Sequence, residues 1–147
     1  MSTSAAHPHH LIHLGVEPTA SDRQPRPLSP AVRAGDFVYV SGQVPVDAEG
    51  QIVAGGIEAQ TRQVMANIQS VLALAGATLG DVCKTTVWLE DARDFGAFNR
   101  VYMSYFPGGK PARSTVESRL MIAAKVEIDV VAYRPTVQPA SLVHGSS

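Results

Sequence analysis

The sequence predicts an α+β domain in which two helices cover one face of a mixed sheet. Three kinds of segment support this: stretches rich in β-branched and aromatic residues, stretches with apolar residues at helical spacing, and Gly- or Pro-bearing turns between them. In chain order they give β-β-α-β-α-β-β, which buries its apolar residues when the helices pack on the sheet. A chain of 147 residues, 45% apolar and 17% charged, is long enough for one such domain.

The first half of the domain holds two strands and the longer helix. We expect the domain to begin near Pro30 and to turn at residues 34–36 (Ala-Gly-Asp) between its first two strands. The second strand covers residues 37–41, and another turn follows at residues 47–50. A helix is predicted over residues 57–75, because its apolar residues recur at spacings of three and four: Val64, Ile68, Val71, Leu72 and Ala75. Gly76 then ends this helix.

The second half holds three strands and the shorter helix. Residues 82–89 are rich in β-branched side chains and predict a strand. Residues 91–94 provide aspartates that can cap a helix over residues 95–105, which the sequence at 107–109 (Pro-Gly-Gly) ends. The apolar residues of that helix fall at helical spacing: Phe98, Val101, Tyr102 and Tyr105. Two alternating segments, residues 112–118 and 125–133, predict the last two strands.

The two ends of the chain are expected to contribute little to the core. Residues 1–29 contain four prolines and little periodicity, so they predict a poorly ordered N-terminal extension. Histidines at positions 7, 9, 10 and 13 suggest a metal site, but nothing in this segment fixes ligand geometry, and we prefer a solvated tail with no metal. The domain then covers residues 30–135, and residues 136–147 form a C-terminal tail.

Charge and hydropathy exclude several classes of function. The net charge is −1 and the basic residues are spread along the chain, so no basic field attracts nucleic acid or an acidic membrane. No apolar run reaches the roughly 18 residues of a membrane span, and no signal peptide pattern is present. We therefore expect a cytoplasmic protein with neither nucleic acid nor membrane as partner. The single cysteine, Cys83, is expected to be a buried, unreactive thiol.

Common catalytic motifs are missing, and an arginine becomes the leading functional candidate. There is no P-loop, no Gly-x-Ser-x-Gly and no Cys-x-x-Cys, and residues 30–134 contain no histidine. Arg113 begins an alternating segment in which Thr115, Glu117 and Arg119 are expected on the same strand face. A guanidinium on a rigid strand can bind a carboxylate through two parallel hydrogen bonds. We therefore expect Arg113 to bind a small carboxylate-bearing ligand.

The last strand separates apolar from charged side chains. Its apolar residues, which we expect under the helices, are Val126, Ile128, Val130 and Ala132. The other face carries Lys125, Glu127, Asp129 and Tyr133, which meet solvent or a partner subunit. On this pattern alone, an ordinary solvated face with cross-strand ion pairs is the first interpretation.

Five short blocks carry a family resemblance. They are Ser41-Gly-Gln-Val-Pro45, Asp81-Val-Cys-Lys-Thr-Thr-Val-Trp-Leu89, Asp94-Phe-Gly-Ala-Phe-Asn99, Pro111-Ala-Arg-Ser-Thr-Val-Glu117 and Val126-Glu-Ile128. Their order and spacing, over about residues 30–133, resemble those of the RidA (YjgF/L-PSP) family. The resemblance implies a chorismate-mutase-like protomer that assembles into a homotrimer with a cleft at each subunit interface.

The resemblance also implies an activity and a set of site residues. Members of this family deaminate reactive enamines and imines, such as 2-aminoacrylate, to 2-keto acids and ammonia, and no cofactor is implied. By position, Arg113 would bind the substrate carboxylate and Glu127 would orient the attacking water. Ser41 and Asn99 fall on positions that line the cleft, and Thr115 stands where many members have a cysteine. The expected catalytic residues are thus Arg113 and Glu127, with Ser41, Asn99, Arg113 and Thr115 binding substrate.

One departure from the family keeps alternatives open. Many active members carry a tyrosine over the cleft where this chain has Leu28. A non-catalytic trimer that binds small carboxylates through Arg113 is therefore one alternative, and a pathway-specific deaminase for an aminomuconate-like substrate is another. An RNA-directed activity, described for some members, is disfavoured by the net charge of −1 and by the absence of a basic stripe.

Overall fold

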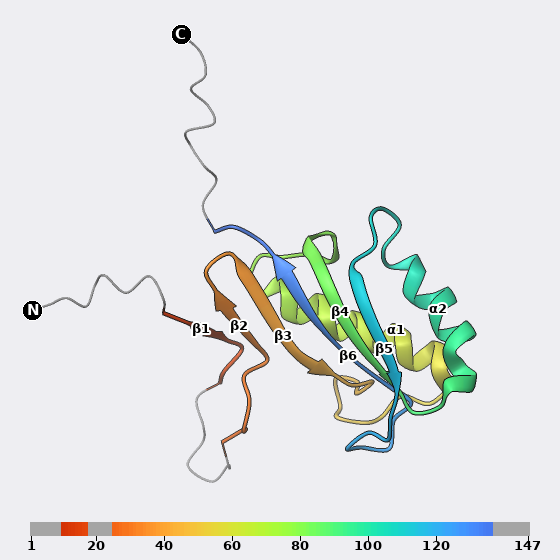
Figure 1. Ribbon diagram of the computed structural model, residues 1–147. Coiled ribbons are helices and arrows are strands. Elements are labelled where there is room, and N and C mark those ends of the chain that lie inside the picture. The colour runs from red at the N-terminus through yellow and green to blue at the C-terminus, as the bar shows by residue number, and fades with distance from the viewer. Residues whose placement is uncertain (1–9, 18–24, 137–147) are drawn as a thin grey trace, which may run out of the picture.

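A six-stranded mixed sheet with two helices on one face forms the domain (Figure 1). The computed structural model describes residues 10–17 and 25–136. Its strands are β1 (Ile12–Leu14), β2 (Ala31–Ala34), β3 (Phe37–Gln43), β4 (Val82–Leu89), β5 (Ala112–Glu117) and β6 (Val126–Tyr133), in the spatial order β1-β2-β3-β6-β4-β5. The helices are α1 (Gly56–Ala73) and α2 (Phe95–Ser104). β4 and β5 run parallel and the other neighbours antiparallel, which confirms the predicted α+β class and mixed sheet.

The core lies between the sheet and α1. The buried residues of α1 are Ile57, Gln60, Thr61, Val64, Met65, Ile68 and Leu72. The predicted apolar face of β6 lies under them, because Val126, Ile128, Val130 and Ala132 are all buried. Gly76 has a φ of +70°, a conformation that suits glycine, and it follows the end of the helix as expected. The helical and strand periodicities of the sequence therefore locate this core correctly.

Strand β1 lies in the N-terminal segment for which the sequence predicted little order. It pairs antiparallel with β2, with Ile12 opposite Arg33 and Leu14 opposite Ala31, and Leu14 packs against the core. Three residues are too few for a periodic signal, and the backbone hydrogen bonds of β2 supply the stabilisation that the pattern cannot reveal. The expectation of a poorly ordered extension therefore fails for this strand.

Two other expectations about the chain ends concern residues that lie partly outside the described ranges. The histidines at positions 7 and 9 and residues 137–147 of the C-terminal tail lie outside them. His13 lies in β1, where its Nδ1 is 3.2 Å from the hydroxyl oxygen of Ser29. Within residues 10–17 and 25–136, no three His, Cys, Asp or Glu side chains gather closely enough to hold a metal ion. In the same residues neither helix has the length and hydropathy that crossing a bilayer requires.

The sheet face opposite the helices carries polar, charged and aromatic side chains. Tyr39 of β3 and Tyr133 of β6 lie there, and each is 49% exposed. Cys83 is exposed as well, which contradicts the expected buried thiol. The reason is a break in the β4–β6 register between Val82 and Lys84, which removes Cys83 from the simple alternation of the strand.

Candidate functional site

Arg113 lies on β5, the strand at one edge of the sheet, and points to the helix side. It pairs with Thr85 of β4, whose side chain is fully buried beneath the helices. Thr115 and Glu117 share this face of β5 by alternation, as predicted. Arg119 lies beyond the end of β5, so the expectation that it continues the face was wrong. The edge position leaves Arg113 half-buried and open to a ligand.

The guanidinium of Arg113 has one hydrogen-bond partner in the described part of the chain. Its Nη1 donates to Oδ1 of Asn99 over 2.9 Å, and Asn99 comes from α2. The ion pairs among the described residues involve other side chains, so no carboxylate neutralises this cation there. An arginine has five N–H donors, and most of those of Arg113 therefore remain available for a ligand.

Aromatic rings fix the direction of this guanidinium. Its central carbon lies 4.8 Å from the ring centre of Tyr102 and 5.7 Å from those of Phe95 and Phe98, within cation–π range. The hydroxyl of Tyr102 is 2.8 Å from that of Thr85 in the core. Arg113 is thus held over rings that are themselves fixed, which leaves one edge of the guanidinium for a carboxylate.

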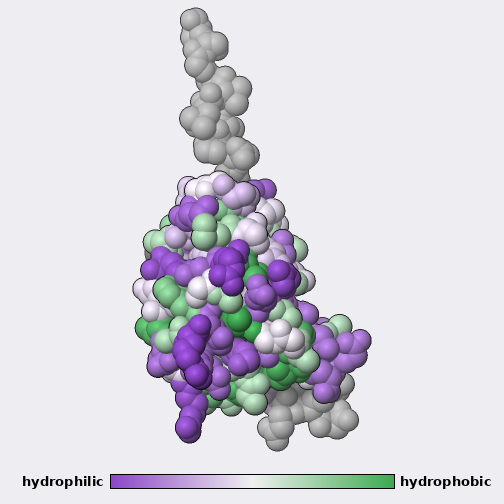
Figure 2. Space-filling model, turned by 90° about the vertical axis from the view of Figure 1, so that its right-hand side faces the viewer, coloured by the Kyte–Doolittle hydropathy of each residue, from purple (hydrophilic) through white to green (hydrophobic). Residues whose placement is uncertain are grey.

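A pocket of about 170 Å³ lies between β5 and the start of α2, and we call it the β5–α2 pocket. Phe95, one of its lining residues, also contacts the guanidinium of Arg113. It is lined by Leu89, Ala92, Phe95, Thr115, Val116 and Glu117. The hydroxyl oxygen of Thr115 is buried and has no hydrogen-bond partner among the described residues. On the side of the molecule that carries β5 and α2, apolar areas lie between polar ones (Figure 2).

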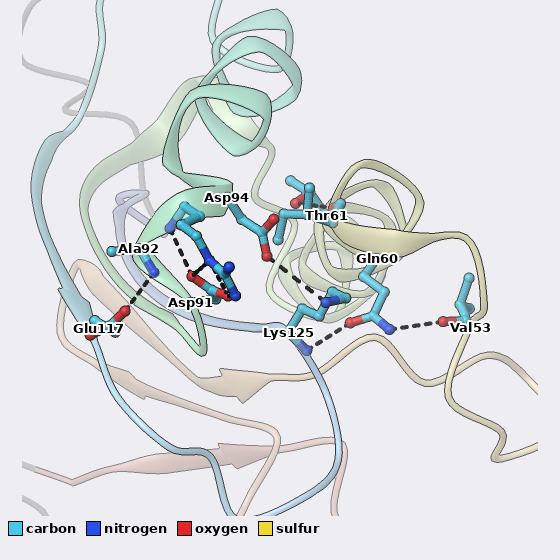
Figure 3. A network of polar contacts seen from close by, with 10 residues as sticks. Val53, Gln60, Thr61, Asp91, Ala92, Asp94, Glu117 and Lys125 are labelled. Carbon is cyan, nitrogen blue, oxygen red and sulfur yellow. Dashed lines mark hydrogen bonds and ion pairs between the residues drawn. The ribbon is translucent and has the colours of Figure 1, made fainter.

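Backbone and carboxylate contacts shape the rim of this pocket (Figure 3). The amide of Ala92 donates to Oε2 of Glu117 over 2.6 Å, which ties the 3₁₀ turn Ala92–Asp94 to β5. Asp91 accepts hydrogen bonds from the amide and side chain of Arg93, and these bonds lower its pKa to about 2. The rim is therefore held by contacts that do not involve Arg113.

The start of β6 is fastened to α1 by a second set of contacts in the same view (Figure 3). The amide of Lys125 donates to Oε1 of Gln60 over 2.8 Å, and Nε2 of Gln60 donates to the carbonyl of Val53 over 3.0 Å. The ammonium of Lys125 is 4.0 Å from a carboxylate oxygen of Asp94. These contacts fix the register of β6, and with it the position of Glu127.

Glu127 lies on the face of the sheet opposite to Arg113. It pairs with Trp88 of β4, and its half-buried carboxylate packs directly over Gly42, where an added Cβ atom would collide with it. Burial raises the pKa of Glu127, and the negative charge of Asp129 raises it further. Burial also raises the pKa of Asp129, while a hydrogen bond with Thr86 opposes that shift. Gly42 therefore makes room for a carboxylate with an elevated pKa.

Ser41 lies two residues after Tyr39 in β3, so alternation places it on the face of the sheet that carries Glu127. Its hydroxyl donates to the carbonyl of Ser29 over 2.6 Å. Leu28, which we expect at the position of a tyrosine in many active members of the family, comes just before Ser29 and is 54% exposed. The hydroxyl of Ser41 is thus used to hold the segment that carries Leu28.

The predicted site residues form two groups that one protomer keeps apart. Arg113 and Thr115 lie on the helix side of β5 with Asn99 of α2, whereas Ser41 and Glu127 lie on the other face. β4 separates β5 from β6, so the two strand axes are about 10 Å apart in the sheet. A ligand bound by Arg113 therefore does not reach Glu127 of the same chain.

Some supporting residues were not identified from the sequence as part of the site. Tyr102 and Phe98 fit a helical core stripe, so their additional contact with a cation had no signal of its own. Phe95, three residues before Phe98, extends this stripe, so its contact with the cation likewise had no signal of its own. Gly42 did have a signal in the sequence, because a glycine within a strand often marks close approach of another group.

Comparison with known proteins finds relatives that match most of this chain. The sequence model of the family described as Endoribonuclease L-PSP matches residues 21–134. The 2-iminobutanoate/2-iminopropanoate deaminase of Salmonella typhimurium is 38% identical over 122 residues, which cover 78% of this chain and 95% of that protein. The mouse protein of the same name is 40% identical over 108 residues, or 72% of this chain and 80% of the relative. A RutC family protein of Pyrococcus horikoshii is 45% identical over 119 residues, which cover 78% of this chain and 94% of that protein.

Solved structures share the fold at similar identity. The crystal structure of E. coli TdcF with bound serine superimposes with a TM-score of 0.71 and 34% identity, covering 76% of this chain and 91% of that one. RidA from a Psychrobacter species gives a TM-score of 0.70 and 35% identity, covering 80% of this chain and 94% of that one. The sequence matches and the shared fold lead to one conclusion: this chain belongs to the RidA (YjgF/L-PSP) family.

Proposed function

We propose that this protein hydrolyses reactive enamines and imines derived from amino acids, giving 2-keto acids and ammonia without a cofactor. The observation that carries the proposal is the state of Arg113, a half-buried guanidinium aimed by Asn99 and three aromatic rings with no carboxylate partner among the described residues. Such a group suits a ligand carboxylate that binds in a fixed direction. The names of the deaminase relatives support the same reaction.

The reaction depends more on holding the substrate and the attacking water in the right orientation than on a strong acid or base. An enamino acid first gains a proton on carbon and becomes a 2-imino acid. Water then adds to the imine carbon, a proton moves to nitrogen, and the carbon–nitrogen bond breaks to leave a 2-keto acid and ammonia. Arg113 would hold the carboxylate, and the carboxylate of Glu127 would accept a hydrogen bond from the attacking water.

The separation of Arg113 from Glu127 supports a site shared between copies. In one protomer the two side chains occupy opposite faces of the sheet, with β4 between their strands. A neighbouring copy can supply the missing carboxylate, and the aromatic and charged sheet face offers a surface for such contact. We therefore propose a homotrimer with inter-subunit clefts, in which Arg113 of one copy faces Glu127 of the next.

Subunit complementation tests this arrangement. Arg113→Ala and Glu127→Gln chains, each inactive alone, are co-expressed with different tags and recovered as mixed trimers. In a ring, every mixed trimer rebuilds one intact cleft of its three, so the recovered mixed trimers regain about one third of wild-type activity. If both residues acted within one protomer, no cleft would regain both groups. Mixed trimers without activity would therefore refute the shared cleft.

A binding protein without turnover is the second candidate. TdcF was crystallised with serine bound, and serine carries the carboxylate that Arg113 suits. Adding the protein to a dehydratase that releases 2-aminoacrylate separates the two candidates. An enzyme accelerates pyruvate formation, whereas a binding protein shows keto-acid binding by calorimetry and leaves the rate unchanged.

A further inference from the structure

The β5–α2 pocket is larger than the smallest imino acids need. Its volume of about 170 Å³ is similar to that of an engineered cavity of about 150 Å³ that binds benzene. Leu89, Ala92, Phe95 and Val116 give it mainly apolar walls. A methyl group, the side chain of 2-iminopropanoate, would leave most of this space to water.

The pocket lies where the side chain of a bound substrate would be. Phe95 forms one wall and also lies 5.7 Å from the guanidinium carbon of Arg113. Thr115 forms another wall and follows Arg113 by two residues on the same strand face. A 2-imino acid carries its carboxylate, its nitrogen and its side chain close together. With the carboxylate on Arg113, the other two groups meet Thr115 and the pocket.

Thr115 carries an unsatisfied hydroxyl in the wall of this space. Its hydroxyl oxygen is buried and has no partner among the described residues, and an unsatisfied buried hydroxyl is unfavourable. The imine N–H of a bound substrate would donate to this oxygen. The same contact would direct the substrate side chain away from Arg113 and toward Leu89 and Ala92.

The charge of the pocket restricts what can enter. Glu117 closes one side, and its carboxylate is held by the amide of Ala92 at 2.6 Å. A second carboxylate on the ligand would approach this negative charge in a mainly apolar space, which is unfavourable. The pocket therefore suits neutral apolar side chains and opposes acidic ones, including the dicarboxylate of an aminomuconate-like substrate.

From these contacts we propose that the β5–α2 pocket receives the substrate side chain and gives the protein a preference for 2-imino acids with branched aliphatic or aromatic side chains. This inference rests on the proposed deaminase function and adds a substrate class to it. The relatives' names specify only 2-iminopropanoate and 2-iminobutanoate, whose chains have three and four carbons.

Steady-state kinetics test the preference. An L-amino-acid oxidase with catalase generates the imines of leucine, phenylalanine and alanine, and semicarbazide traps whatever the protein does not hydrolyse. We expect kcat/KM for the leucine-derived imine to exceed that for the alanine-derived imine by at least about tenfold, since even one methylene in an apolar pocket is worth about that factor. A ratio near one would overturn the inference.

Two variants fill the pocket to different extents from one wall. Ala92→Leu and Ala92→Phe are both expected to lower the leucine-to-alanine ratio of kcat/KM by about tenfold. Ala92 is exposed, so a larger side chain there is compatible with folding. The matched control is Ala66→Leu on the exposed face of α1, which should leave the ratio as in the wild type. An unchanged ratio in both filling variants would contradict the assignment of the pocket.

Calorimetry with unreactive keto acids separates this inference from the proposed function. We expect 4-methyl-2-oxopentanoate to bind at least about tenfold more tightly than pyruvate, and Ala92→Leu to remove the difference. Binding preference without turnover would overturn the deaminase proposal and keep the pocket. Turnover of both imines with no preference in rate or binding would keep the deaminase and overturn the pocket.

Discussion

Replacing Arg113 by lysine and by alanine distinguishes the contribution of its charge to transition-state binding from the contribution of its planar shape. Lysine keeps the positive charge but offers a single ammonium in place of the planar guanidinium. It also loses most of the stacking on Tyr102, whose ring centre lies 4.8 Å from the guanidinium carbon. Alanine removes the charge, the stacking and the hydrogen bonds together.

The size of both effects follows from the contacts of Arg113. Two parallel hydrogen bonds to a carboxylate are each worth about 1.5–3 kcal/mol, so alanine is expected to cost about 3–6 kcal/mol of transition-state binding. That corresponds to a loss of about 10²- to 10⁴-fold in kcat/KM. Lysine is expected to lose one of these bonds, or about 2 kcal/mol and about 30-fold.

The assay couples the protein to a dehydratase that releases 2-aminoacrylate from serine. Semicarbazide competes for the imine, so deaminase activity appears as a lower rate of semicarbazone formation. Arg62→Ala is the matched control, because Arg62 is exposed on α1 and is expected to leave the rate unchanged. Light scattering and thermal unfolding show whether each variant keeps the assembly and stability of the wild type.

Two results would contradict this reasoning about Arg113. The first is a folded Arg113→Ala protein that keeps more than about half of the wild-type kcat/KM, which would mean that the substrate carboxylate binds elsewhere. The second is an Arg113→Lys protein as impaired as Arg113→Ala, which would mean that the charge of this side chain contributes nothing and that its planar shape carries the whole effect.

Two further predictions concern the opposite face of the sheet. Gly42→Ala should lower kcat/KM at least about tenfold, because its new Cβ atom collides with the Glu127 carboxylate and displaces it. Gly80→Ala is the control, since the nearest atom to its Cβ is 3.6 Å away; equal activity of the two variants would contradict the role of Gly42. Asp129→Asn should move the acidic limb of the kcat/KM–pH profile to lower pH. Burial and then Asp129 raise the pKa of Glu127 above 4.5, and removing that negative charge allows Glu127 to ionise at lower pH. A limb that stays in place or moves to higher pH would contradict this reasoning.

Much of the fold follows from local pattern. The strand predicted at residues 82–89 has the bounds of β4, and both helices end within two residues of their predicted ends. Alternation also places Arg113, Thr115 and Glu117 on one face of β5. These features depend on side-chain periodicity, which a single sequence contains.

The relation between the two halves of the site could not be predicted from pattern. Alternation assigns residues to the two faces of one strand, but the faces of β5 and β6 are related only through their pairing with β4. Arg113 opposite buried Thr85 and Glu127 opposite Trp88 therefore became visible only in the folded sheet. The exposure of Cys83 was missed for a similar reason, since a register break is invisible to local periodicity.

The placement of Arg113 and Glu127 on opposite faces also bears on how the protein would behave in a cell. A newly made chain carries Arg113, which would bind the substrate carboxylate, and Glu127, which would orient water. In that single chain the two groups lie too far apart to act on the same substrate. In the proposed arrangement, such a chain is inactive until it assembles with other copies. The concentration of the protein would then control its activity. At low concentration, unassembled subunits would bind substrates without converting them.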